Sequence, residues 1–149
     1  MHTLYLNKFN HESLNPKQIY INKDGLIKIS DPILLGLEKN YITVLKKRND
    51  EGTYLSPEIM NFLDDCNFSF YDKETSDVFV LGLIMLEASL LKKIELYDTE
   101  KKRPKLESLP SFLHEVRERY SESYAEILRR MLQLHSRHRP KLGEIVLKI

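Results

Sequence analysis

Apolar side chains occupy every second position in two short runs near the start of the chain. Residues 18–22 carry isoleucine at positions 19 and 21, and residues 26–30 repeat the pattern at positions 27 and 29. Lys23 to Gly25 lie between the two runs and have the composition of a tight turn. Alternation on both sides of a turn predicts a β-hairpin over about residues 18–30.

Helical spacing replaces this alternation later in the chain. The run from Val78 to Leu86 is apolar on every side of a helix, which predicts a helix that is buried all round at the centre of the fold. Thr75 or Ser76 can cap this helix at its N-terminus. Pro57 suits the first turn of a shorter helix that precedes it.

Three further helices are predicted toward the C-terminus. The first covers residues 111–120, and Ser123 with Glu126 forms a capping box ahead of the second. Pro140 opens the last helix. The polar stretch over residues 94–110 is predicted to be a surface loop. The whole pattern predicts a mainly α fold with a small β-hairpin packed on a helical bundle.

Length and composition favour one globular unit. The 149 residues suit a single domain, predicted to cover residues 1–149. It divides into the hairpin, a loop without periodicity over residues 31–58, and a helical part over residues 57–149. The formal net charge of +1 gives no general attraction to nucleic acid or to an anionic membrane.

Cysteine usage and hydropathy indicate the compartment. Cys66 is the only cysteine, so no internal disulfide can form and a reducing compartment is expected. The longest strongly apolar run, Val78 to Leu86, is too short to cross a bilayer. The start of the chain, MHTLYLNKFNHE, lacks the basic residues and apolar core of a signal peptide. We therefore expect a cytoplasmic protein with neither membrane nor nucleic-acid partners.

Several separated motifs carry a family resemblance. They are HESLNPKQ from His11 to Gln18, DPI from Asp31 to Ile33, SPE from Ser56 to Glu58, and the helical segments SDVFVLGLIMLE and RRMLQLHSRHRP. In order and spacing they resemble the catalytic loop, the D-F-G segment, the A-P-E motif and two helices of the C-terminal lobe of eukaryotic protein kinases. The resemblance covers nearly the whole chain. It implies a protein-kinase C-lobe-like helical bundle that lacks the N-terminal lobe.

The positions that carry chemistry in that family are altered. By the resemblance, Ser13 stands in place of the catalytic aspartate, Asn15 in place of a phosphate-neutralising lysine, and Gln18 in place of a magnesium-binding asparagine. A neutral hydroxyl is no general base, and the longer glutamine fits a fixed coordination distance poorly. Asp31 remains as a residual metal ligand or, in the competing interpretation, as a cap of the hairpin end. The sequence therefore predicts no catalytic residue, no cofactor, no independent ATP binding, and a protein that is not an enzyme.

The residues that hold the framework of that family are present. The resemblance implies that His11 packs beneath the active site and that Asp77 holds the backbone of the catalytic loop. It further implies a buried ion pair between Glu58 at the end of the activation segment and Arg139 near the last helix.

A framework that keeps its structural residues and loses its reactive ones is typical of a pseudokinase. We therefore expect an inactive kinase-like lobe that serves as a protein-interaction or structural scaffold module. Two alternatives remain. The first is a structural subunit of a large assembly, and the composition, rich in Lys, Asn, Ile and Tyr, suggests a cilium or cytoskeleton as its location. The second is the C-terminal half of a split or truncated kinase that another chain completes. A protein partner is expected to cover the face left by the N-terminal lobe. The residues predicted for this face are Leu4, Phe9, Leu14, Pro32, Ile33 and Leu34.

Overall fold

The computed structural model describes residues 10–11, 14–30, 54–65, 71–98 and 103–146, and within them the protein is mainly helical. In chain order the elements are the 3-10 turn η1 (Pro16–Gln18), β1 (Ile19–Ile21), β2 (Ile27–Ile29), α3 (Pro57–Asp65), α4 (Lys73–Leu90), β3 (Tyr97–Asp98), β4 (Arg103–Pro104), α5 (Leu109–Arg119), α6 (Glu122–Met131), the 3-10 turn η4 (Ser136–His138) and α7 (Leu142–Val146). The strands form two antiparallel pairs, β1 with β2 and β3 with β4. The mainly α fold with a small hairpin that the sequence predicted is confirmed.

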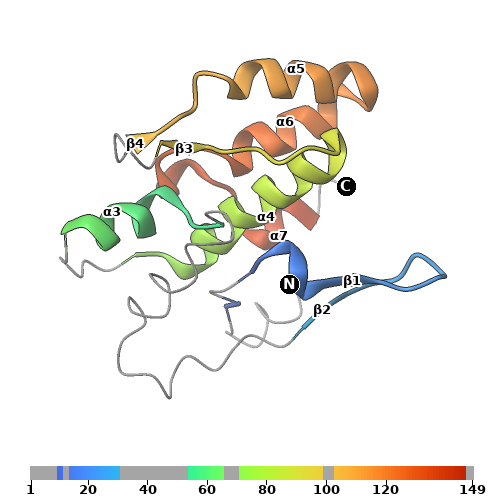
Figure 1. Ribbon diagram of the computed structural model, residues 1–149, viewed down its shortest axis with the longest axis horizontal. Helices are drawn as coiled ribbons and strands as arrows, with labels where there is room; N and C mark the ends of the chain where they lie inside the picture. Colours follow the sequence, from blue (N-terminus) through green and yellow to red (C-terminus); the bar gives the residue numbers. More distant parts are fainter. Residues whose placement is uncertain (1–9, 12–13, 31–53, 66–70, 99–102, 147–149) are drawn as a thin grey trace.

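The predicted hairpin is present at the expected place. Ile19 lies opposite Ile29 and Ile21 opposite Ile27 in the β1–β2 register. Gly25 closes the turn with a φ of 79°, a conformation that costs glycine little because it has no Cβ. Only the end of the hairpin near η1 packs on the helices, and the rest extends away from them (Figure 1).

Helix α4 is the centre of the helical part, as its all-apolar sequence predicted. It packs against α5, α6 and α7, and it separates α5 and α6 from the hairpin (Figure 1). Val78 and Leu86 are completely buried in it. The approach of α4 to α6 is close, because a Cβ added at Gly82 would lie 2.9 Å from Cβ of Met131.

The start of α4 differs from the predicted cap. Asp72 is the N-cap, and its carboxylate accepts hydrogen bonds from the backbone N–H groups of Glu74 and Thr75. The prediction of a cap at Thr75 or Ser76 is therefore wrong. Lys141 also pairs with Asp72, so a residue far along the chain helps to stabilise this first turn.

The stretch over residues 94–110 is more than the predicted surface loop. It contains β3, β4 and the first residues of α5. Ile94, Leu96 and Leu109 are each less than a tenth exposed and belong to the core cluster around α4. Their spacing has no regular period, so the sequence pattern alone did not reveal their burial.

Helices α5 and α6 form an antiparallel pair with a very short connection. Ser121, and not the predicted Ser123, caps α6 by accepting a hydrogen bond from the N–H of Tyr124 at 3.2 Å. The hydroxyl of Tyr120 donates to the carbonyl of Ser89 at 3.0 Å and attaches the connection to α4. Across the described ranges, no helix combines the length and the apolar character needed to cross a membrane.

Candidate functional site

The segment that corresponds to a kinase catalytic loop is attached to α4 through His11. Its backbone N–H donates a hydrogen bond of 2.6 Å to a carboxylate oxygen of Asp77 in α4. Its ring Nε2 lies 3.1 Å from the carbonyl oxygen of Ser30, which can only accept, so Nε2 carries the proton. Burial lowers the pKa of the His11 imidazole and favours the neutral ring. One buried residue thus joins the loop, the end of the hairpin and the central helix.

Two polar side chains of this loop, those of Asn15 and Gln18, are bonded to each other. Asn15 caps η1 by accepting from the N–H of Lys17 at 3.0 Å. The side-chain oxygen of Gln18 accepts from both the backbone N–H and the side-chain amide of Asn15, at 3.1 and 3.0 Å. Gln18 therefore uses its oxygen to stabilise the loop.

Leu14 holds the same loop on the apolar side of α4. It is 2% exposed and packs with Val80 and Ile84. The sequence had placed Leu14 on an interaction face, but its contacts lie within this chain. Its side chain is not available to a partner in this conformation.

Several residues singled out in the sequence lie outside the described residues. These are Ser13 and Asp31 among the positions predicted for chemistry, and Leu4, Phe9, Pro32, Ile33 and Leu34 among those predicted for the interaction face. Within the part of the chain that the structure describes, no group of three or more His, Cys, Asp or Glu side chains could hold a metal ion.

Glu58 and Arg139 connect the start of α3 with the segment before α7. The Arg139 guanidinium donates to both carboxylate oxygens of Glu58, each at 2.7 Å. It also donates to the carbonyl oxygens of Gln133, Thr75 and Leu134, at 2.7, 3.0 and 3.0 Å. The Arg139 side chain is 0% exposed and that of Glu58 17%. The pair therefore ties α3 to α4 and to the segment around η4.

Two further links hold the segment before α3 on α4. The Tyr54 hydroxyl donates to Glu87 at 2.7 Å, and the same carboxylate accepts from the N–H of Ile94 at 2.8 Å. Burial and then the Glu87 carboxylate raise the pKa of Tyr54. Ser56 and Ser76 share a buried hydrogen bond of 2.8 Å between their hydroxyls. Reasoning from sequence missed Glu87, although a lone acidic residue within an apolar helix was an available signal.

A groove of about 350 Å³ lies between α5 and α6, away from the catalytic-loop segment at His11 to Gln18. Its apolar lining includes Leu109, Leu113 and Ala125, and its rim carries Arg117 and Glu122. None of the residues that the sequence predicted for chemistry lines it.

Comparison with known proteins agrees with this framework. The profile of the family described as "Protein tyrosine and serine/threonine kinase" matches residues 1–149. The membrane-associated tyrosine- and threonine-specific cdc2-inhibitory kinase wee-1.3 of Caenorhabditis elegans is 30% identical over 89 residues, which are 60% of this chain and 12% of that protein. The human serine/threonine-protein kinase Nek2 is 26% identical over 137 residues, which are 91% of this chain and 29% of that protein.

These matches correct one expectation and establish the family. The chain spans less than a third of the length of the curated relatives that it matches. The prediction that the protein is not an enzyme is wrong, because the family profile and the named kinases among its relatives point to a protein kinase enzyme. With the fold of a kinase C-terminal lobe and a family match along its whole length, this chain belongs to the protein tyrosine and serine/threonine kinase family.

Proposed function

We propose that this chain forms the substrate-side lobe of a protein kinase, which transfers the γ-phosphate of ATP to hydroxyl side chains of proteins once a nucleotide-binding lobe completes the site. The names of the relatives support this substrate class, since they describe kinases for tyrosine, threonine and serine. The observation that carries the proposal is the hydrogen bond from His11 to Asp77, because it holds the catalytic-loop segment in a defined place on α4.

The chemistry of phosphoryl transfer suits a lobe of this kind. The reaction depends mainly on positioning of the reactants and on neutralisation of charge. His11, Leu14 and Asn15 each contribute contacts that hold the loop in position. By the resemblance, Ser13 stands at the position of the catalytic aspartate, so a hydroxyl replaces the carboxylate that would act as the general base. A positioned general base typically contributes about 10²- to 10⁴-fold to the rate. The proposed kinase should therefore be slow, and Ser13→Asp should make it faster.

A second role as a protein-interaction or scaffold module is supported by the hydrogen bonds within the loop. The Gln18 side-chain oxygen takes two hydrogen bonds from Asn15, so these side chains stabilise a surface turn. A turn held by its own side chains can present a defined surface to another protein. This role is compatible with the kinase proposal and does not replace it.

The proposal is tested with the full-length protein, radiolabelled ATP, Mg²⁺ and a mixture of peptides that contain serine, threonine or tyrosine. We expect incorporation of phosphate that falls by at least about tenfold in Asp77→Asn, because the bond that this carboxylate makes to His11 is charge-assisted. Glu95→Gln removes an exposed carboxylate and is the matched control, with no expected loss. Circular dichroism of both variants checks that they remain folded.

Two results would contradict the kinase proposal. The first is no incorporation above background by the unmodified protein. The second is an equal loss in Asp77→Asn and Glu95→Gln, which would show that the contact with His11 has no part in positioning the loop.

A further inference from the structure

The loop segment from Asn15 to Gln18 closes on itself through a capping box. The backbone N–H and the side-chain amide of Asn15 both donate to Oε1 of Gln18, at 3.1 and 3.0 Å. The backbone N–H of Gln18 donates in turn to the carbonyl of Asn15 at 3.0 Å. A cap residue followed three positions later by glutamine is the spacing of this motif, because glutamine is long enough to reach back to the cap.

The partners of both side-chain amides fix their orientation. The backbone N–H of Lys17 can only donate, so the atom of Asn15 that faces it at 3.0 Å is the oxygen Oδ1. The NH2 group of Asn15 is therefore the one directed toward Gln18. Because both groups of Asn15 that face Gln18 are donors, the acceptor is Oε1 of Gln18. A carbonyl oxygen has two lone pairs, and these two hydrogen bonds use both.

Gln18 also belongs to the path that holds the loop on the rest of the fold. Its carbonyl accepts from the N–H of Ser30 at 2.9 Å, and the carbonyl of Ser30 lies 3.1 Å from Nε2 of His11. His11 in turn donates from its backbone to Asp77 of α4. Hydrogen bonds within the protein therefore hold this part of the loop in position.

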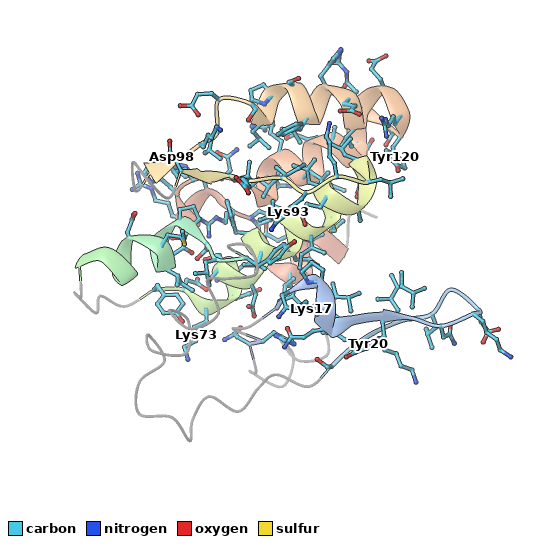
Figure 2. The ribbon with its side chains drawn as sticks, viewed as in Figure 1. Lys17, Tyr20, Lys73, Lys93, Asp98 and Tyr120 are labelled. Atoms are coloured by element: carbon cyan, nitrogen blue, oxygen red, sulfur yellow. The ribbon has the colours of Figure 1, made fainter. Side chains whose placement is uncertain are left out.

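A metal ion that the kinase family implies does not fit this arrangement. Protein kinases bind ATP with two Mg²⁺ ions, and the asparagine of the catalytic loop is a ligand of one of them. By the resemblance, Gln18 stands at that position. A ligand oxygen must offer a lone pair to the cation, but both lone pairs of Oε1 accept from Asn15. Lys17, which Figure 2 shows on η1, adds a positive charge to the same turn.

We propose that the Asn15–Gln18 capping box replaces this metal ligand, so that the site binds ATP with one divalent cation fewer than protein kinases that have asparagine at this position. The inference rests on the proposed kinase function and deepens it. The additional methylene of glutamine accounts for the difference, because it lets Oε1 reach back to the cap and commits this oxygen to the loop. Asparagine is too short to complete the capping box, so its oxygen stays available to a cation.

The number of bound metal ions tests the proposal directly. Mn²⁺ prefers the same oxygen ligands as Mg²⁺, and its free form is measured by electron paramagnetic resonance. The full-length protein is titrated with Mn²⁺ in the presence of a saturating non-hydrolysable ATP analogue. We expect about one Mn²⁺ per bound nucleotide in the unmodified protein and about two in Gln18→Asn.

Asn22→Ala is the matched control for the loss of a side-chain cap. Asn22 stabilises the hairpin turn by accepting from the N–H groups of Asp24 and Leu26 at 3.1 and 2.7 Å. It lies outside the capping box, so its replacement should leave the Mn²⁺ count at about one.

Hydrogen exchange reports on the capping box independently of activity. The backbone N–H of Asn15 should exchange about fivefold faster or more in Gln18→Asn, because it loses its acceptor. In the unmodified protein, Mg²⁺ added with the ATP analogue should leave this exchange rate unchanged. A metal ion that bound Oε1 of Gln18 would open the capping box and accelerate the exchange. This second measurement needs no variant, so it tests the proposal even if Gln18→Asn does not fold.

Two results would overturn the inference and leave the kinase proposal in place. The first is the same Mn²⁺ count in the unmodified protein and in Gln18→Asn, with phosphate still incorporated in the kinase assay. The second is faster exchange at Asn15 when Mg²⁺ and the ATP analogue are added. Absence of nucleotide-dependent Mn²⁺ binding in both proteins, together with no incorporation of phosphate, would instead overturn the kinase proposal and this inference with it.

Discussion

Replacing Glu58 by glutamine is expected to destabilise the protein far more than the same change at an exposed ion pair. The substitution keeps the size of the side chain but removes the charge that faces the Arg139 guanidinium. Arg139 is 0% exposed in its side chain and lies 4.8 Å from the centre of the Phe79 ring. The cation cannot turn to water, so it stays buried without its counter-charge.

The structure sets the size of the effect. Breaking a buried ion pair by removing one partner costs about 3–5 kcal/mol, because the remaining charge is uncompensated. The three backbone carbonyls that also accept from Arg139 reduce this cost, since they retain part of its solvation. We expect about 3 kcal/mol for Glu58→Gln. Arg139→Met should cost more, because those carbonyls lose their donor as well.

The chain contains its own control. Arg129 donates to both oxygens of Glu126 at 2.6 Å, but the side chains of this pair are 54% and 45% exposed. The geometry is similar and the burial is not. An exposed pair of this kind contributes about 0.2–1 kcal/mol, so Glu126→Gln should have a small effect.

Urea unfolding followed by circular dichroism measures both variants. With a slope of about 1–3 kcal/mol per molar urea, the loss expected for Glu58→Gln lowers the midpoint by about 1–3 M. With the same slope, the midpoint of Glu126→Gln should move by at most about a third as much. If the two variants unfold at the same urea concentration, burial of the Glu58–Arg139 pair does not determine how much the pair contributes to the free energy of unfolding.

Three further predictions concern packing, backbone strain and pH. Gly82→Ala should lower the free energy of unfolding by about 1–2 kcal/mol in urea, because its Cβ would lie 2.9 Å from that of Met131; an unchanged midpoint would contradict the close approach of α4 and α6. Leu91 has a φ of 52° and is 88% exposed, so its backbone is strained and its side chain contributes little packing. Leu91→Gly should therefore have a higher melting temperature than Leu91→Ala, by the equivalent of about 1 kcal/mol, and a lower melting temperature for the glycine variant would refute strain at this position. Burial lowers the pKa of His11, so the unfolded chain binds a proton more readily than the folded chain. The free energy of unfolding should therefore be full above about pH 6.5 and should decrease as the pH falls below it. The decrease should be shallower in His11→Asn. Equal pH profiles of the two proteins in urea unfolding would exclude His11 as the cause.

Local patterns in the sequence were sufficient for the elements whose reasons are local. The alternation around the turn at Gly25 predicted the hairpin, because strand faces and turn conformations depend on neighbouring residues. The all-apolar run of α4 predicted its central position, because a helix without a polar face must be covered on all sides. The order of the motifs also predicted the fold of a kinase C-terminal lobe.

Helix boundaries depended on contacts that the local pattern does not contain. Asp72 caps α4 three residues before Thr75 and is also bonded to Lys141, which comes from the other end of the chain. Ser121 caps α6 in place of Ser123, since Tyr120 is attached to α4 and leaves only a short connection after α5. Both serines are good caps by residue type, and packing decided between them.

Several features of the candidate site and of the hairpin were decided by the tertiary structure alone. The bond between His11 and Ser30 and the link from Tyr54 to Glu87 join residues that are distant in the sequence, and no spacing rule relates them. The same holds for exposure: the isoleucines of β1 and β2 have one pattern in the sequence, yet Ile19 is partly buried while Ile27 is 61% exposed. Periodicity determines which residues share a face of a strand, because it follows from backbone geometry. How much of that face is covered depends on which residues from elsewhere in the chain pack against it, as the cluster around Leu14 does at Ile19, and only the folded chain determines that.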